Sequence, residues 1–111
     1  MDELVAEKVL RAVELIPPGE VVSYGDLAGL VGSGPRQVGA IMREYGSEVT
    51  WWRVVNASGD VPSHLRAKAR PYWEDEGIAW KPNGLGCRIS HYRTDLAALA
   101  AEWDLAVSDL E

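Results

Sequence analysis

Few side chains in this sequence could act as a nucleophile or hold a metal, since its 111 residues include one cysteine and two histidines. The cysteine, Cys87, lies in a stretch (85–90) where apolar residues alternate with polar or small ones, a pattern typical of a half-buried strand. We therefore expect Cys87 to be a small buried apolar residue. A single cysteine forms no intrachain disulfide and no zinc-binding cluster, and we expect no metal or cofactor.

The second notable stretch pairs two tryptophans with an arginine, in the order Trp51-Trp52-Arg53. An indole ring offers a flat apolar wall and one N–H donor, but it has neither a thiolate nor a basic nitrogen. Arg53 has a fixed donor fork, for which we expect a role in holding the loop. The aromatic and β-branched residues predict a strand over residues 51–55, followed by a turn at 56–60.

The charge is unevenly distributed along the chain. The net charge is −6, which is unfavourable for binding phosphates. However, residues 36–93 contain nine basic and six acidic residues, whereas residues 94–111 contain five acids and no base. A basic middle between acidic ends could present one positive face to nucleic acid, although such segregation alone is a weak indication.

Two short helices in the first half of the chain predict a helix-turn-helix. An amphipathic helix over residues 4–16 is followed by Ser23, which with Asp26 can form a capping box at the start of a helix over 24–31. A glycine-containing break then leads to Pro35, which suits the first turn of a third helix. Two helices joined in this way are found in DNA-binding proteins and also in helical hairpins that bind no DNA.

The second half predicts a helix over residues 67–76, with Pro71 either kinking it or marking its first turn. Thr94 is predicted to cap a last helix that extends to Leu110. Its apolar stripe is expected to pack on its own domain, and the alternative is that the stripe forms a dimer contact. The length suits one domain, residues 1–111, with a single core. The acidic N-terminus and the lack of a long apolar run favour a cytoplasmic protein that binds no membrane.

Four signatures, in order and at similar spacing, make residues 5–90 resemble the O6-alkylguanine-DNA alkyltransferase family. They are Tyr24, the helix segment Arg36-Gln37-Val38-Gly39-Ala40-Ile41-Met42-Arg43, the segment Trp51-Trp52-Arg53-Val54-Val55, and Glu76-Gly77. The resemblance implies a winged helix-turn-helix like the C-terminal domain of that family, mainly α with a small β wing. It also implies binding to double-stranded DNA.

The family's active-site motif is altered in this chain. Its enzymes carry Pro-Cys-His-Arg-Val, where the cysteine takes the alkyl group, whereas this chain has Thr50-Trp51-Trp52-Arg53-Val54. Without the thiol and the relay histidine, Glu76 has nothing to activate, and alkyl transfer at Trp51 is excluded. The chain is similar to the alkyltransferase-like subgroup, whose members are not enzymes. The resemblance implies a monomer that binds O6-alkylguanine by nucleotide flipping and flags it for nucleotide-excision-repair proteins.

The resemblance also implies roles for individual residues. Arg36 would enter the base stack to fill the gap left by the flipped nucleotide, and Tyr24 would press on the target phosphate. Gly39 and Ala40 would let the recognition helix approach the groove closely, and Arg43 would contact a phosphate. The lesion pocket would be formed by Met42, Trp51, Trp52, Val54, Glu76 and one or both of His64 and Arg66, between which the sequence does not choose.

Two other functions remain open at this point. A divergent alkyltransferase could use Cys87 as its acceptor. A winged-helix transcription regulator would bind undamaged DNA as a dimer, for which the last helix would have to supply the contact.

Overall fold

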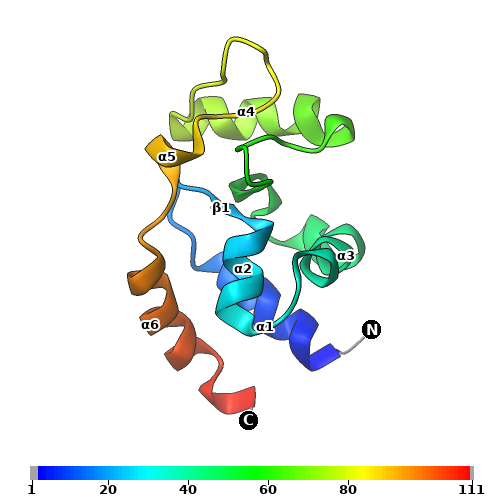
Figure 1. Cartoon of the computed structure of the whole chain (residues 1–111), viewed down its shortest axis with the longest axis vertical. Coiled ribbons are helices and arrows are strands. Elements are labelled where there is room, and N and C mark those ends of the chain that lie inside the picture. Colours follow the sequence, from blue (N-terminus) through cyan, green and yellow to red (C-terminus); the bar gives the residue numbers. More distant parts are fainter. Residues whose placement is uncertain (1–2, 111) are drawn as a thin grey trace.

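The computed structural model describes residues 3–110 and is mainly helical (Figure 1). Its regular elements are α1 (Glu3–Glu14), β1 (Val22–Ser23), α2 (Tyr24–Val31), α3 (Pro35–Tyr45), β2 (Val54–Val55), α4 (Arg66–Glu76), α5 (Ile89–Tyr92) and α6 (Leu96–Ala106). Short 3-10 helices lie at η1 (Gly46–Glu48), η2 (Trp51–Arg53), η3 (Ser63–Leu65) and η4 (Ser108–Leu110). The molecule measures 43 × 27 × 21 Å, with α4 at one end and α1, α2 and α6 toward the other.

The predicted helix-turn-helix is present as α2 and α3. The capping box forms, because the Ser23 hydroxyl accepts from the Asp26 N–H while the Asp26 carboxylate accepts from the Ser23 N–H. Helix α2 ends at Gly32, whose φ of 77° lies in the left-handed region that glycine adopts without strain. Pro35 occupies the first turn of α3 as expected.

The two short strands divide the apolar interior into two clusters, where the sequence had suggested one core. They pair in parallel, Val22 with Val54 and Ser23 with Val55. Since successive strand residues face opposite sides, Val54 packs in the cluster formed by α1, α2, α3 and α6, and Val55 packs in the cluster around α4. The sheet thus joins the helix-turn-helix to the α4 end of the molecule.

The predicted strand over residues 51–55 is correct only for its last two residues. Trp51–Arg53 is a 3-10 turn. A strand would send Trp51 and Arg53 to one face and Trp52 to the other, whereas the 3-10 turn spreads the three side chains about 120° apart. Each of the three therefore reaches a different set of partners, described below.

The predicted strand over residues 85–90 was wrong. Gly86 forms an isolated antiparallel bridge with Asp60, and the chain then turns into the short helix α5. The two backbones meet closely here, because a Cβ on Gly59 would collide with the Cys87 carbonyl and its φ is +86°. Alternating polarity predicted a strand, but the close approach at two glycines produces a bridge between loops.

The last helix begins later and ends earlier than predicted. Asp95, not Thr94, caps α6 by accepting from the N–H groups of Ala97 and Ala98, while Thr94 is buried and its N–H donates to the Val21 carbonyl. The predicted packing of the stripe on its own domain is present. Leu99 is buried, and Trp103 packs beside α1 and donates to the Lys8 carbonyl at 2.9 Å.

Helix α4 begins at Arg66 and contains Pro71 in its interior, on the exposed side. Pro71 therefore does not mark the first turn of this helix. None of the helices described between residues 3 and 110 is long and apolar enough to cross a bilayer.

Candidate nucleic-acid interface

Helix α3 carries an exposed arginine near each end. Val38 and Ile41 turn into the core, whereas Arg36 and Arg43 are exposed. The spacing i, i+3, i+7 places Arg36, Gly39 and Arg43 on one side of the helix, about 10 Å from end to end at 1.5 Å per residue. A Cβ at Gly39 would meet nothing within 4 Å. The face is therefore low in the middle and basic at its ends, a shape that permits close approach to a DNA groove.

Tyr24 lies at the start of α2 and is half buried against the core. Burial raises the pKa of its phenol, and the positive charge of Arg43 acts in the opposite direction. The phenol therefore stays protonated at neutral pH and can donate a hydrogen bond.

A groove of about 180 Å³ lies between α3 and α4, beside Trp51. Its walls are Met42, Arg43, Gly46, Ser47, Trp51, His64, Leu65 and Lys68. Indole, thioether and aliphatic surfaces therefore lie next to two cations.

Four of the residues predicted from the sequence line this groove, namely Met42, Arg43, Trp51 and His64. The sequence did not identify Gly46, Ser47, Leu65 or Lys68. The one sequence signal for Lys68 is that it is a cation four residues after His64, and the two residues belong to different elements, η3 and α4. Of the two candidates left open, His64 lines the groove, whereas the Arg66 guanidinium donates to the Val61 carbonyl at 2.9 Å.

Besides Arg66, three predicted pocket residues lie away from the groove lining. Val54 is 2% exposed and packs in the core. Trp52 and Glu76 belong to a hydrogen-bond network behind the groove. The Glu76 Oε2 accepts from the Trp52 indole N–H and from the Arg53 guanidinium, both at 2.7 Å.

The network continues through the other Glu76 oxygen. Oε1 accepts from Arg53 Nε at 3.0 Å and from the Gly19 N–H at 2.9 Å, and a third Arg53 nitrogen donates to the Ile16 carbonyl. Burial raises the pKa of Glu76, but the hydrogen bonds from Arg53, Gly19 and Trp52 outweigh it, so the net pKa is lowered. Arg53 holds the loop as expected, and the charged Glu76 ties the end of α1 to the end of α4.

The aromatic rings around Trp51 are also fixed in orientation. Trp52 stacks on Tyr72 with ring centroids 3.7 Å apart and planes 10° apart. Trp51 meets both rings edge-on, at 5.7 Å from Trp52 and 5.9 Å from Tyr72. Because Trp52 is anchored to Glu76, the stack presents Trp51 to the groove as a rigid wall.

Cys87 is fully buried in the cluster around α4. Burial raises the pKa of its thiol to about 11. At neutral pH it is therefore a protonated thiol with little nucleophilic character, which argues against the enzyme that would use Cys87.

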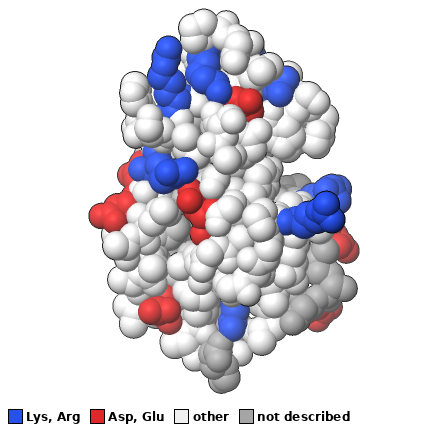
Figure 2. All heavy atoms as spheres, viewed as in Figure 1, with Lys and Arg blue, Asp and Glu red and all other residues white. Residues whose placement is uncertain are grey.

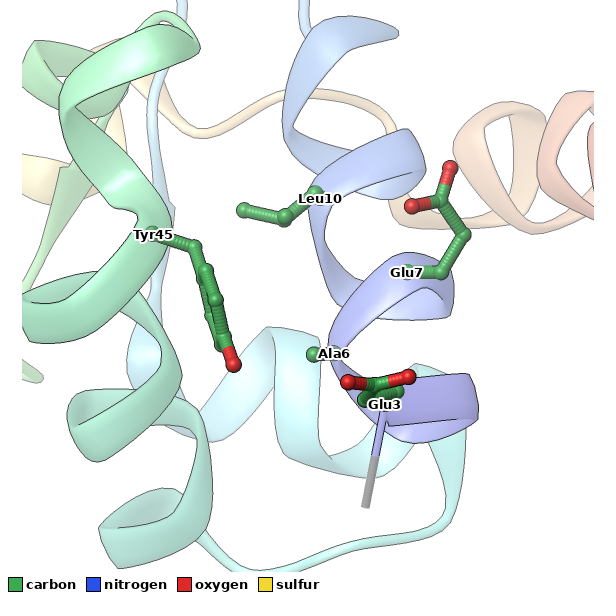
Figure 3. Close-up of a pocket in the computed structure, with 5 residues that line it drawn as sticks. All are labelled: Glu3, Ala6, Glu7, Leu10 and Tyr45. Carbon is green, nitrogen blue, oxygen red and sulfur yellow. The ribbon is translucent and has the colours of Figure 1, made fainter. Parts of the chain in front are cut away.

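Figure 2 shows several Lys and Arg side chains over the end of the molecule formed by α4, and further ones at mid-height on both sides, with Asp and Glu among them. A groove of larger volume, about 240 Å³, lies between α1 and α3 and is lined by Glu3, Ala6, Glu7, Leu10 and Tyr45 (Figure 3). Its two carboxylates would repel phosphate.

The sequence is similar to those of known proteins. The DNA base-flipping protein of Escherichia coli is 42% identical over 59 residues, which cover 50% of this chain and 46% of that protein. The chain thus spans about half the length of this curated relative. Alkyltransferase-like protein 1 of Schizosaccharomyces pombe is 37% identical over 94 residues, covering 78% of this chain and 86% of that protein.

The fold matches solved structures. The S. pombe Atl1 protein in complex with damaged DNA containing O6-carboxymethylguanine superposes with a TM-score of 0.73 at 28% identity, over 86% of this chain and 98% of that one. The S. pombe ATL protein in complex with DNA gives 0.72 at 30% identity and the same coverage. Residues 5–78 match the family described as 6-O-methylguanine DNA methyltransferase, DNA binding domain. The chain belongs to this family.

Proposed function

We propose that this protein binds duplex DNA through α3 and receives an extruded O6-alkylguanine in the groove beside Trp51, without transferring the alkyl group. The observation that carries the proposal is the position of Trp51, which forms the apolar wall of the groove at the place in the motif where the family's enzymes have their cysteine. An indole wall favours contact with an alkyl substituent but accepts no alkyl group.

The remaining site residues support the same function. Arg36 and Arg43 can meet the backbone or the base stack on either side of the low surface at Gly39, and Tyr24 can donate to a phosphate. An alkylated guanine pairs weakly, so extruding it costs less than extruding guanine. This difference, together with contact at Trp51, would give selectivity for the lesion. Relatives named as a base-flipping protein and as Atl1 bound to damaged DNA support the proposal.

A binder that leaves the lesion in place is useful only if another protein acts on it. We therefore propose that the complex marks the lesion for nucleotide-excision-repair proteins. The support for this step is the family resemblance.

The test is fluorescence anisotropy of a short duplex with one O6-methylguanine against the same duplex with guanine, at a stated ionic strength. We expect tighter binding to the lesion and no change in the intact mass of the protein. Trp51→Ala should reduce the preference, and Arg36→Ala should weaken binding to the lesion. Equal binding to both duplexes would refute lesion recognition and favour a transcription regulator, whereas a gained methyl mass would favour an enzyme.

A further inference from the structure

The groove beside Trp51 differs in charge from the other grooves of the molecule. Its lining contains Arg43, Lys68 and His64 but no carboxylate. Each of the four other grooves compared on the described residues is lined by at least one carboxylate. These are Glu3 and Glu7 in the first groove, Asp26 in the second, Glu20, Asp95 and Glu102 in the third, and Glu7, Glu14 and Glu48 in the fourth. A protein with a net charge of −6 thus keeps this groove free of negative charge.

The two fixed cations of the groove are also not neutralised within the protein. Other basic side chains form ion pairs, for example Lys81 with Asp60 at 2.6 Å and Arg53 with Glu76 at 2.7 Å. Between residues 3 and 110, neither Arg43 nor Lys68 lies within 4.0 Å of a carboxylate. Their charges are therefore available to a ligand.

Arg43 and Lys68 approach the groove from different elements. Arg43 belongs to the face of α3 that would meet DNA, so phosphates would compete for its charge. Lys68 lies on α4, one turn after His64, on the wall opposite α3. Lys68 is thus the cation that remains for a group inside the groove.

We propose that the site prefers O6-substituents that end in an anionic group over neutral substituents of the same shape, and that Lys68 provides the discrimination. This inference rests on the proposed function and names its ligand class. The methylene of such a substituent would contact Trp51, and its carboxylate would lie near the Lys68 ammonium. Lys68 is exposed, so solvent screens the attraction, and the expected preference is about threefold.

The experiment compares three duplexes that differ at one base, which is guanine, O6-carbamoylmethylguanine or O6-carboxymethylguanine. The two adducts have the same shape and differ in charge. We expect the wild-type protein to bind the carboxymethyl duplex about threefold more tightly than the carbamoylmethyl duplex, and this ratio to fall toward one in Lys68→Gln. Arg88→Gln is the matched control, because it removes an exposed cation outside the groove and should leave the ratio unchanged.

The outcomes separate this inference from the proposed function. If the wild-type protein binds both adducts equally but more tightly than guanine, the charge preference is refuted and lesion binding stands. If it binds neither adduct more tightly than guanine, lesion binding itself fails. If Lys68→Gln weakens all three duplexes by one factor, Lys68 contacts DNA phosphate and the inference is overturned. Urea unfolding of both variants checks that each is folded.

Discussion

Glu76 offers a test of whether the residues behind the groove form one cooperative unit. Its carboxylate accepts four hydrogen bonds, from Arg53 twice, from Trp52 and from Gly19. The paired side chains of Arg53 and Glu76 are 10% and 8% exposed. Glu76→Gln keeps the size of the side chain but replaces one acceptor oxygen with an NH2 group. This group cannot accept hydrogen bonds from the donors that surround the carboxylate.

The cost follows from the donors that lose an acceptor. If the glutamine oxygen takes the place of Oε1, the Trp52 indole and one Arg53 nitrogen face the NH2 group. A buried donor left without a partner costs about 1–3 kcal/mol, so two should cost about 3 kcal/mol together. This agrees with the range of about 3–5 kcal/mol for removing one member of a buried ion pair. It corresponds to a drop in Tm of about 12 °C for a chain of this size.

The assay is urea unfolding followed by circular dichroism, with the exposed Glu74→Gln in the same helix as control. The pKa of Glu76 is lowered from its ordinary value of 4.5 in the folded protein. Its stabilising effect is therefore complete above pH 4.5 and is lost as the pH falls through the folded-state pKa. The difference between wild type and Glu76→Gln should shrink in acid. A loss below about 1 kcal/mol at pH 7, or a difference that persists unchanged in acid, would refute the reasoning.

Three further predictions concern the supporting structure. Gly59→Ala should destabilise the protein by more than about 2 kcal/mol in thermal unfolding, because the φ of +86° and the Cys87 carbonyl both oppose a Cβ; the same change at Gly39, where a Cβ meets nothing, is the control. Asp95→Ala should lower the free energy of unfolding by about 1 kcal/mol through loss of the α6 cap, and no change would contradict the capping role. Cys87 should react with a disulfide reagent at pH 8 only after urea is added, since its pKa is about 11; rapid reaction of the native protein would show that the thiol is accessible.

Much of the helical framework could be predicted from local sequence. The capping box at Ser23 and the proline at the start of α3 are local signals, because the groups that satisfy a helix end lie within a few residues of it. The helix-turn-helix was therefore correct. Alternating polarity was a poorer guide at residues 85–90, because the same alternation arises when a loop buries every second side chain against a neighbouring loop.

The site was predictable only in part. The motif identified Trp51 and Met42, and both residues line one groove. It did not separate Trp52 from Trp51, although the two adjacent indoles have different surroundings, one on the groove and the other stacked on Tyr72. Their directions follow from the 3-10 turn, and the Trp52 indole is held by Glu76, 24 residues away in sequence.

By itself, then, the sequence determined the chemistry that this protein lacks, since no arrangement of indole and arginine at positions 51–53 supplies a thiolate. It also determined the helices whose ends are capped locally. Only the tertiary structure decided that Lys68 lines the Trp51 groove, that Val54 lies in the core, and that Glu76 pairs with Arg53. The reason is physical: capping is satisfied by near neighbours in the chain, whereas burial and charge pairing depend on which distant segments the folded chain brings together.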